Sequence, residues 1–199
     1  MLRRSEEGGF TLPELVVVMV VISVIIAAMF TFLTGSTRRY LALQKDGTAF
    51  GSLAGETQRI ASVLRGLTDI TAASNDEITA YAYFYPTDTY VSIVRYYKTT
   101  DSKQLLADVT PMTANPPIGS PITASKKTYT IIPTLYSGAS VTTFVYLDSA
   151  GAQLTTPISD LHTIKGIKIS LVAPADTVTN GASTTMSLQI SLRNRKTNL

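Results

Sequence analysis

The sequence contains no cysteine, no tryptophan and a single histidine, His162. Without cysteine the chain cannot form a disulfide, hold a cysteine-ligated zinc or iron–sulfur centre, or use a thiol nucleophile. Any histidine-based acid–base scheme would depend on one imidazole. These absences favour a structural or binding protein over an enzyme, and we expect no cofactor and no metal.

Charge is also scarce. Charged residues make up 16% of the chain, below the roughly 25% that is usual for soluble domains. The deficit is local, because residues 15–33 form a run of 19 residues without a charge. A helix of that length spans roughly 28 Å and can cross a bilayer, whereas the apolar stretch of a secretory signal peptide has about 7 to 15 residues. The run therefore predicts a transmembrane helix.

A short polar leader meets this apolar run at residues 8–14, which read GGFTLPE. Two glycines resist helix formation, and Pro13 disfavours helix in the residue before it. We therefore expect the peptide bond after Gly9 to be extended and open to a protease. If the chain is cut there, Pro13 becomes its fourth residue, where a missing N–H costs no helical hydrogen bond.

Glu14 places a carboxylate at the head of the apolar run. Such a group costs about 1 to 3 kcal/mol in a membrane helix unless it finds a partner. A cut after Gly9 would create a cation at the same depth, the α-amino group of Phe10. In a side-by-side assembly that amino group can neutralise Glu14 of a neighbouring subunit and fix the stagger between helices.

At these residues the sequence resembles the type IV pilin superfamily, which comprises pilins and the pseudopilins of type II secretion and competence systems. The family pattern is a short leader ending in glycine, then Phe-Thr-Leu-x-Glu, then an unbroken apolar helix. The resemblance implies that prepilin peptidase cuts between Gly9 and Phe10, that Phe10 is N-methylated, and that Glu14 acts in assembly. The competing interpretation is an ordinary signal-anchor helix with a chance Gly-Phe junction.

Beyond the apolar run a heptad spacing of apolar residues predicts that the helix continues outward and covers a sheet. The stripe consists of Leu43, Phe50, Leu53, Ile60, Leu64 and Leu67. Gly47, Gly51 and Gly55 share one helical face, which indicates either close helix approach in a filament or a weak stretch. We expect any local melting of the helix near residues 34–36.

After Ser74 the apolar pattern changes to an alternating one, which predicts strands. The expected strands cover 78–85, 90–97, 104–109, 128–136, 141–147, 164–172 and 184–193, with a short return at 153–154. The first two should form a hairpin, and the proline-rich stretch 110–125 should be a loop. The predicted fold is α+β and pilin-like, with one long N-terminal helix packed on an antiparallel sheet domain. The expected divisions are 1–9 (leader), 10–37 (membrane and assembly helix), 38–73 (outer helix and connection) and 74–199 (β-rich domain).

Tyr81, Tyr83 and Tyr85 should share one strand face near Arg95 and Lys98. Aromatic rings interleaved with cations suit single-stranded nucleic acid or a glycan. The favoured interpretation is a sheet face packed under the long helix or against a neighbouring subunit.

The remaining polar residues give weaker patterns. The basic residues are Lys126, Lys127, Lys165, Lys168, Arg193, Arg195 and Lys196, and we expect them to form a solvated edge rather than a DNA contact. His162 is interpreted as structural. Asp148 and Asp160 lack the dense carboxylate spacing of a calcium loop.

Together these observations predict a filament subunit, in a type IV pilus or in a secretion or competence pseudopilus. The expected partners are prepilin peptidase, other pilin subunits, the inner-membrane assembly platform and membrane lipid before assembly. The chain should be a single-pass cytoplasmic-membrane protein with its C-terminal domain outside, and then part of an extracellular filament. The large outer region and the lack of a closing disulfide favour a minor subunit. The alternatives are a non-polymerising anchored β-domain that acts as an adhesin or receptor and, third, an anchored enzyme.

Overall fold

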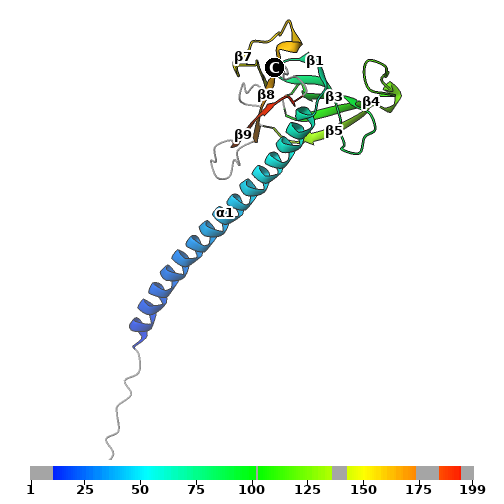
Figure 1. Ribbon diagram of the computed structural model, residues 1–199. Helices are drawn as coiled ribbons and strands as arrows, with labels where there is room; N and C mark the ends of the chain where they lie inside the picture. Colours follow the sequence, from blue (N-terminus) through cyan, green and yellow to red (C-terminus); the bar gives the residue numbers. More distant parts are fainter. Residues whose placement is uncertain (1–10, 102, 136–142, 174–183, 194–199) are drawn as a thin grey trace, which may run out of the picture. The chain divides into compact units, whose positions relative to one another are not determined.

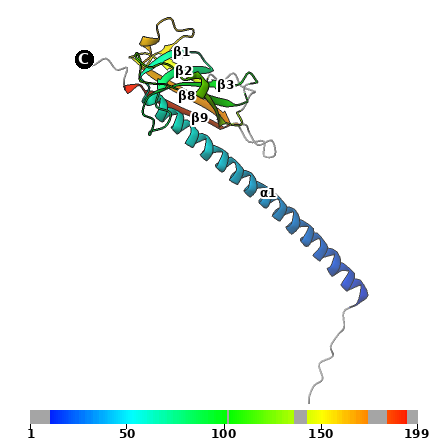
Figure 2. The ribbon, with the colours of Figure 1, turned by 90° about the vertical axis from the view of Figure 1, so that its right-hand side faces the viewer.

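The computed structural model describes residues 11–101, 103–135, 143–173 and 184–193. Helix α1 runs over Leu12–Arg65, and antiparallel strands follow it in the chain (Figures 1 and 2). The chain forms two compact units, Met1–Lys45 and Asp46–Leu199, which are described separately. The predicted α+β class, with one long apolar helix followed by antiparallel sheet, is confirmed.

The second unit contains two antiparallel sheets where the sequence predicted one. The larger has five strands in the order β1-β2-β3-β4-β5. Their bounds are β1 Asp69–Ala73, β2 Glu77–Ala82, β3 Ser92–Lys98, β4 Leu105–Pro111 and β5 Lys127–Ile132. The smaller has the order β7-β6-β8-β9. Its strands are β6 Phe144–Leu147, β7 Gln153–Leu154, β8 Gly166–Ala173 and β9 Thr184–Ser191.

Most strands overlap the ranges that alternation predicted, but β2 ends at Ala82, whereas the predicted strand extended to Tyr85. The expected hairpin is formed by β2 and β3, whose ends pair at Ala82 and Ser92. The stretch 110–125 has the last two residues of β4, one isolated bridge between Met112 and Pro121, and the short 3-10 helix η1 at Thr123–Ser125. Strand β1 was not predicted. It lies in the range 38–73 that the sequence assigned to the outer helix and its connection.

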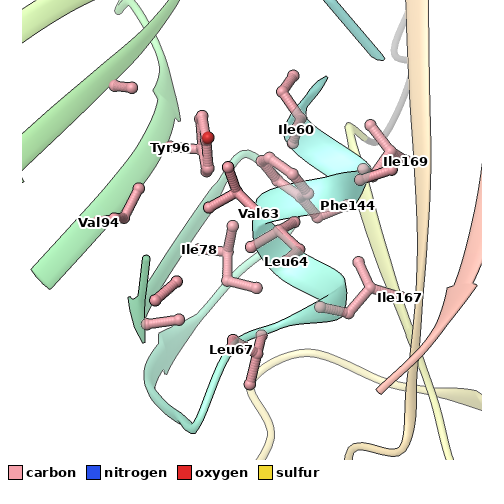
Figure 3. Packing of buried hydrophobic residues seen from close by; sticks show 14 of the residues in the cluster. Ile60, Val63, Leu64, Leu67, Ile78, Val94, Tyr96, Phe144, Ile167 and Ile169 are labelled. Atoms are coloured by element: carbon pink, nitrogen blue, oxygen red, sulfur yellow. The ribbon is translucent and has the colours of Figure 1, made fainter. Parts of the chain in front are cut away.

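The core lies around the last turns of α1, which pack between the two sheets (Figure 3). Leu53, Ile60, Leu64 and Leu67 of the predicted stripe are buried. Toward the larger sheet they meet residues such as Ile78, Val94 and Tyr96, and toward the smaller sheet Phe144, Ile167 and Ile169. Phe50 and Leu43 were predicted to belong to the same buried stripe but are 45% and 72% exposed. The buried stripe therefore begins at Leu53, because only the last turns of the helix are covered by the sheets.

The two sheets are joined by hydrogen bonds at the turn between β1 and β2. The buried hydroxyl of Tyr146 on β6 donates to a carbonyl of this turn and lies 2.9 Å from the oxygens of both Ser74 and Glu77. The backbone N–H of Phe144 donates to the carbonyl of Asn75 at 2.9 Å. These bonds satisfy polar groups that burial would otherwise leave without partners, so they fix how the smaller sheet sits on the larger one.

Candidate functional site

The first turn of α1 contains Glu14, the residue that the sequence singles out for assembly. Leu12 begins the helix, and the N–H of Leu15 donates to the carbonyl of Thr11 at 3.1 Å. Thr11 therefore occupies the N-cap position, and Pro13 lies in the first turn, where no helical acceptor is available for an N–H. The spacing Thr11-x-x-Glu14 is that of a capping box, but the contact in the structure joins the two side chains. Sequence reasoning did not single out Thr11.

Glu14 lies on this first turn with an exposed side chain. The Thr11 hydroxyl donates to its Oε2 at 3.4 Å, and the positive end of the helix dipole also favours a carboxylate here. Among the residues that the structure describes, Glu14 has no basic partner. Gly9 and Phe10, the predicted cleavage and methylation residues, lie outside the described residues.

An unbroken apolar surface follows Glu14 along α1. The large hydrophobic side chains from Leu15 to Leu33 are between 47% and 74% exposed. The segment Leu12–Gln44 is long and apolar enough to cross a membrane, and an 18-residue stretch within it has a mean hydropathy of 3.0 and no buried residue. Exposed apolar surface on this scale marks a membrane or protein interface.

The hydroxyl groups along this surface bond back to the helix itself. Ser23 donates to the carbonyl of Val20 at 2.7 Å, Thr34 to that of Phe30 at 2.7 Å and Thr37 to that of Leu33 at 2.9 Å. The Thr31 hydroxyl lies 2.8 Å from the carbonyl oxygen of Ala28. Because these polar groups find partners within the helix, they do not oppose contact with lipid or with another apolar helix.

The glycines of α1 lie inside a continuous helix. No helix break occurs at Gly35, near which local melting in a filament was expected. A Cβ added at Gly47, Gly51 or Gly55 would meet no atom within 4 Å. This face is therefore open in the single chain.

A line of alternating charges crosses the face of the larger sheet that points away from α1. The Arg95 guanidinium on β3 binds both carboxylate oxygens of Glu77 on β2 at 2.7 Å. Asp108 on β4 is only 7% exposed and accepts hydrogen bonds from Lys126 at 2.7 Å and from Thr128 at 2.6 Å. Arg95 and Asp108 are direct cross-strand neighbours. Sequence reasoning did not single out this network, because it depends on pairings between distant strands.

The network shifts the pKa values of its acids. Burial disfavours the charged form of Asp108, but the hydrogen bonds from Lys126 and Thr128 and the nearby cations outweigh it and hold its pKa below the usual range. The hydrogen bond from Arg95 lowers the pKa of Glu77. A carboxyl whose pKa is lower in the folded state stabilises the fold above its unfolded pKa of about 4, and this contribution is lost as the pH falls through the folded value.

We therefore expect the free energy of unfolding to fall as the pH drops below about 4. Asp108→Asn should lower it at pH 7 by about 1.5 to 3 kcal/mol, the usual contribution of a charge-assisted hydrogen bond, and should flatten the acid dependence. Denaturant titrations of the detergent-solubilised chain at several pH values measure both effects. Asp76→Asn is the control, because the Asp76 side chain is 56% exposed and the amide keeps the Oδ1 acceptor that Lys98 and Thr143 contact, so its loss of charge should cost about 0 to 1 kcal/mol. If the free energy of unfolding of Asp108→Asn fell with decreasing pH as steeply as that of the wild type, this account would be contradicted.

The three tyrosines predicted to share a strand face are not packed under α1. Ile78, Ala80 and Ala82 of β2 face the core, so Tyr81, which alternates with them, faces away from the helix and is half-buried. Small alanine side chains line the inner face, where the helix approaches. Tyr83 and Tyr85 follow the end of β2 and are 39% and 40% exposed. The expectation of a tyrosine face beneath the long helix is therefore wrong, whereas packing of these tyrosines against a neighbouring subunit stays a prediction.

The predicted basic residues that the structure describes belong to several different elements. Lys126 pairs with Asp108, and the N–H of Leu192 donates to the carbonyl of Lys165 at 2.9 Å, which brings the backbone at Arg193 near Lys165. Lys168 lies within β8, whereas Arg195 and Lys196 lie outside the described residues.

His162 and the two candidate calcium ligands take part in local turns. His162 is exposed in the 3-10 helix η2 (Leu161–Thr163), and its backbone N–H donates to Asp160 Oδ1 at 2.9 Å. Asp148 Oδ1 accepts the backbone N–H groups of Ala150 and Ala152, each at 2.8 Å. Within the described ranges, no three of the metal-ligating His, Asp or Glu side chains are grouped to hold an ion.

Comparison with known proteins identifies the N-terminal segment. Residues 4–30 match the prokaryotic N-terminal methylation motif. This match confirms a type IV pilin-like prepilin segment and supports a pilin-like or pseudopilin-like protein. With the apolar helix it indicates membrane anchoring, processing by prepilin peptidase and assembly with other pilins. No curated protein matches the chain.

Proposed function

We propose that this chain is a structural subunit of a type IV pilus or a related pseudopilus and not an enzyme. Prepilin peptidase cuts it after Gly9, Phe10 is N-methylated, and the subunit polymerises through α1. The observation that carries the proposal is the combination, in one helix, of a continuous exposed apolar surface with a carboxylate at its first turn that has no basic partner among the described residues. The motif match over residues 4–30 supports it.

The assembly step follows from the chemistry of the cut end. In the membrane the apolar side chains of α1 contact lipid, and in a filament they contact neighbouring helices, so both environments suit the same surface. The Phe10 amino group created by the cut is the cation that Glu14 of an adjacent subunit requires. In this proposal the leader covers 1–9 and the membrane and assembly helix covers 10–37. The outer helix with its connection covers 38–73, and the extracytoplasmic domain covers 74–199. The assembly platform of the inner membrane moves the subunit out of the bilayer.

The size and composition of the outer region favour a minor subunit over a major one. About 130 residues follow Leu67, and they include a proline-rich loop and no cysteine for a closing disulfide. A major subunit would place an outer region of this size at every position along the filament, which favours a minor subunit.

Filaments sheared from cells should therefore contain this chain in smaller amounts than a shorter companion pilin. Quantitative mass spectrometry of the sheared fraction measures the ratio. If this chain is the dominant component, the minor assignment is wrong. If it remains wholly in the membrane fraction while companion pilins are sheared off, it is an anchored β-domain that does not polymerise, and the proposed function is wrong.

A further inference from the structure

A groove opens at one end of the larger sheet, and its lining residues Val109 and Lys127 are sequence neighbours of Asp108 and Lys126 in the charge line described above. It lies where the segment 83–91 between β2 and β3 meets the segment 112–126 between β4 and β5, and its volume is about 630 Å³. All of its lining residues belong to the second unit and to described segments. A concave site of this size is in the range that small ligands occupy.

Three tyrosines line this groove. Tyr85 and Tyr90 are 40% and 43% exposed, and Tyr129 on β5 is half-buried. The ring of Tyr129 stacks on Phe84 with 5.1 Å between centroids, and the Tyr85 ring meets it edge-on at 6.4 Å. These contacts fix the rings of Tyr85 and Tyr129 against the sheet while part of the aromatic surface stays open to a ligand.

Hydrogen bonds also hold the walls of the groove in place. The backbone N–H of Val91 donates to Asn115 Oδ1 at 2.9 Å and ties the two segments together. Within the first segment, the N–H of Tyr85 donates to Asp88 Oδ2 at 3.0 Å, and the N–H of Asp88 donates to the Tyr85 carbonyl at 3.1 Å. A site that is formed before the ligand arrives loses less conformational entropy on binding.

The polar groups of the groove decide which ligand class it suits. Asp88 and Lys127 supply one charge of each sign, and Ser92 and the tyrosine hydroxyls supply hydrogen-bonding groups. Single-stranded nucleic acid requires a run of cations along its phosphates, and the other nearby lysine, Lys126, is already paired with Asp108. One charge of each sign and several hydroxyl groups suit a neutral ligand with one apolar face and several hydroxyls better than they suit a nucleic acid.

We propose that this tyrosine groove, comprising Tyr85, Asp88, Tyr90, Ser92, Lys127 and Tyr129, binds a neutral oligosaccharide. The C–H groups on one face of a pyranose ring are weakly positive and pack on the negative face of a tyrosine ring. The sugar hydroxyls exchange hydrogen bonds with Asp88, Ser92 and Lys127. This function is separate from filament assembly, and it gives the exposed tyrosines a role that packing within the chain does not.

The test is binding of the full-length chain to an array of neutral oligosaccharides built from glucose, galactose and N-acetylglucosamine. The chain is kept in a zwitterionic detergent without a sugar headgroup, because a maltoside would compete for the groove. We expect at least one array sugar to bind, and calorimetry then gives its dissociation constant. Tyr85→Ala and Tyr90→Ala should each weaken this binding about tenfold, which corresponds to a loss of about 1.4 kcal/mol of binding free energy.

Tyr83→Ala is the matched control, because Tyr83 is 39% exposed in the same segment but does not line the groove. It should bind the sugar as the wild type does, and circular dichroism should show that all three variants are folded. The proposal is overturned if no array sugar binds, if Tyr83→Ala weakens binding as much as the groove variants, or if a thymidine dodecamer binds in a Lys127-dependent way in place of the sugars. If the groove variants fail to enter filaments and no sugar binds, the groove is a contact between subunits. This result also overturns the proposal.

Discussion

Replacing Glu14 with alanine is expected to give a chain that is processed and retained in the membrane but enters filaments poorly. As a monomer in the bilayer the variant loses the desolvation cost of a carboxylate, so insertion should not suffer. In a filament the Phe10 amino group of the neighbour loses its counter-ion, and removing one partner of a buried ion pair costs about 3 to 5 kcal/mol. The amount of the variant in sheared filaments, relative to its amount in the membrane, measures the loss.

Two further variants separate the charge of Glu14 from its local structural role. Thr11→Ala removes the hydroxyl that contacts Glu14 Oε2 but keeps the carboxylate, so it should assemble nearly as well as the wild type. Glu14→Gln keeps the size of the side chain but not its charge, so it should fail as Glu14→Ala does. Assembly of Glu14→Gln at the wild-type level would show that the shape of this side chain matters rather than its charge.

The largest effect on stability is expected from Leu64→Ala. Leu64 is fully buried in the last turns of α1 between the two sheets (Figure 3). Its truncation leaves a cavity that both sheets border, and such substitutions cost about 2 to 5 kcal/mol. Leu43→Ala makes the same change on the same helix at a position that is 72% exposed. It should change the free energy of unfolding by less than about 0.5 kcal/mol.

Denaturant unfolding of both variants in detergent measures the difference. Equal destabilisation by the two substitutions would contradict the placement of the core around the end of α1. Because the core holds both sheets together, Leu64→Ala should also make the β-strands more sensitive to protease, whereas Leu43→Ala should not.

The sequence predicts the features of this fold that depend on local patterns. An uncharged run of 19 residues requires a helix in lipid, because its backbone groups must be satisfied internally. Alternation in segments such as 78–85 and 90–97 identifies β2 and β3 as strands, and the turn residues between them indicate the hairpin. The first turn of α1 was also predictable, since Pro13 is compatible with few other places in a helix.

Features that depend on contacts between distant segments were not predictable in this way. The five residues of β1 have too little alternation to stand out, and their pairing with β2 defines them. Alternation shows that Tyr81 and Ile78 lie on opposite faces, but not which face α1 covers. The division into two sheets and the burial of Asp108 beside Lys126 likewise follow from strand order, which local sequence does not encode.

The most direct test of the central claim is the mass of the N-terminal peptide of the mature chain. In cells with an active prepilin peptidase, we predict that the chain begins at Phe10 with one methyl group on its amino nitrogen, and that a Gly9→Val variant stays uncut. A wild-type chain that still begins at Met1 in such cells would contradict the account, because Glu14 would then have no Phe10 amino group to pair with.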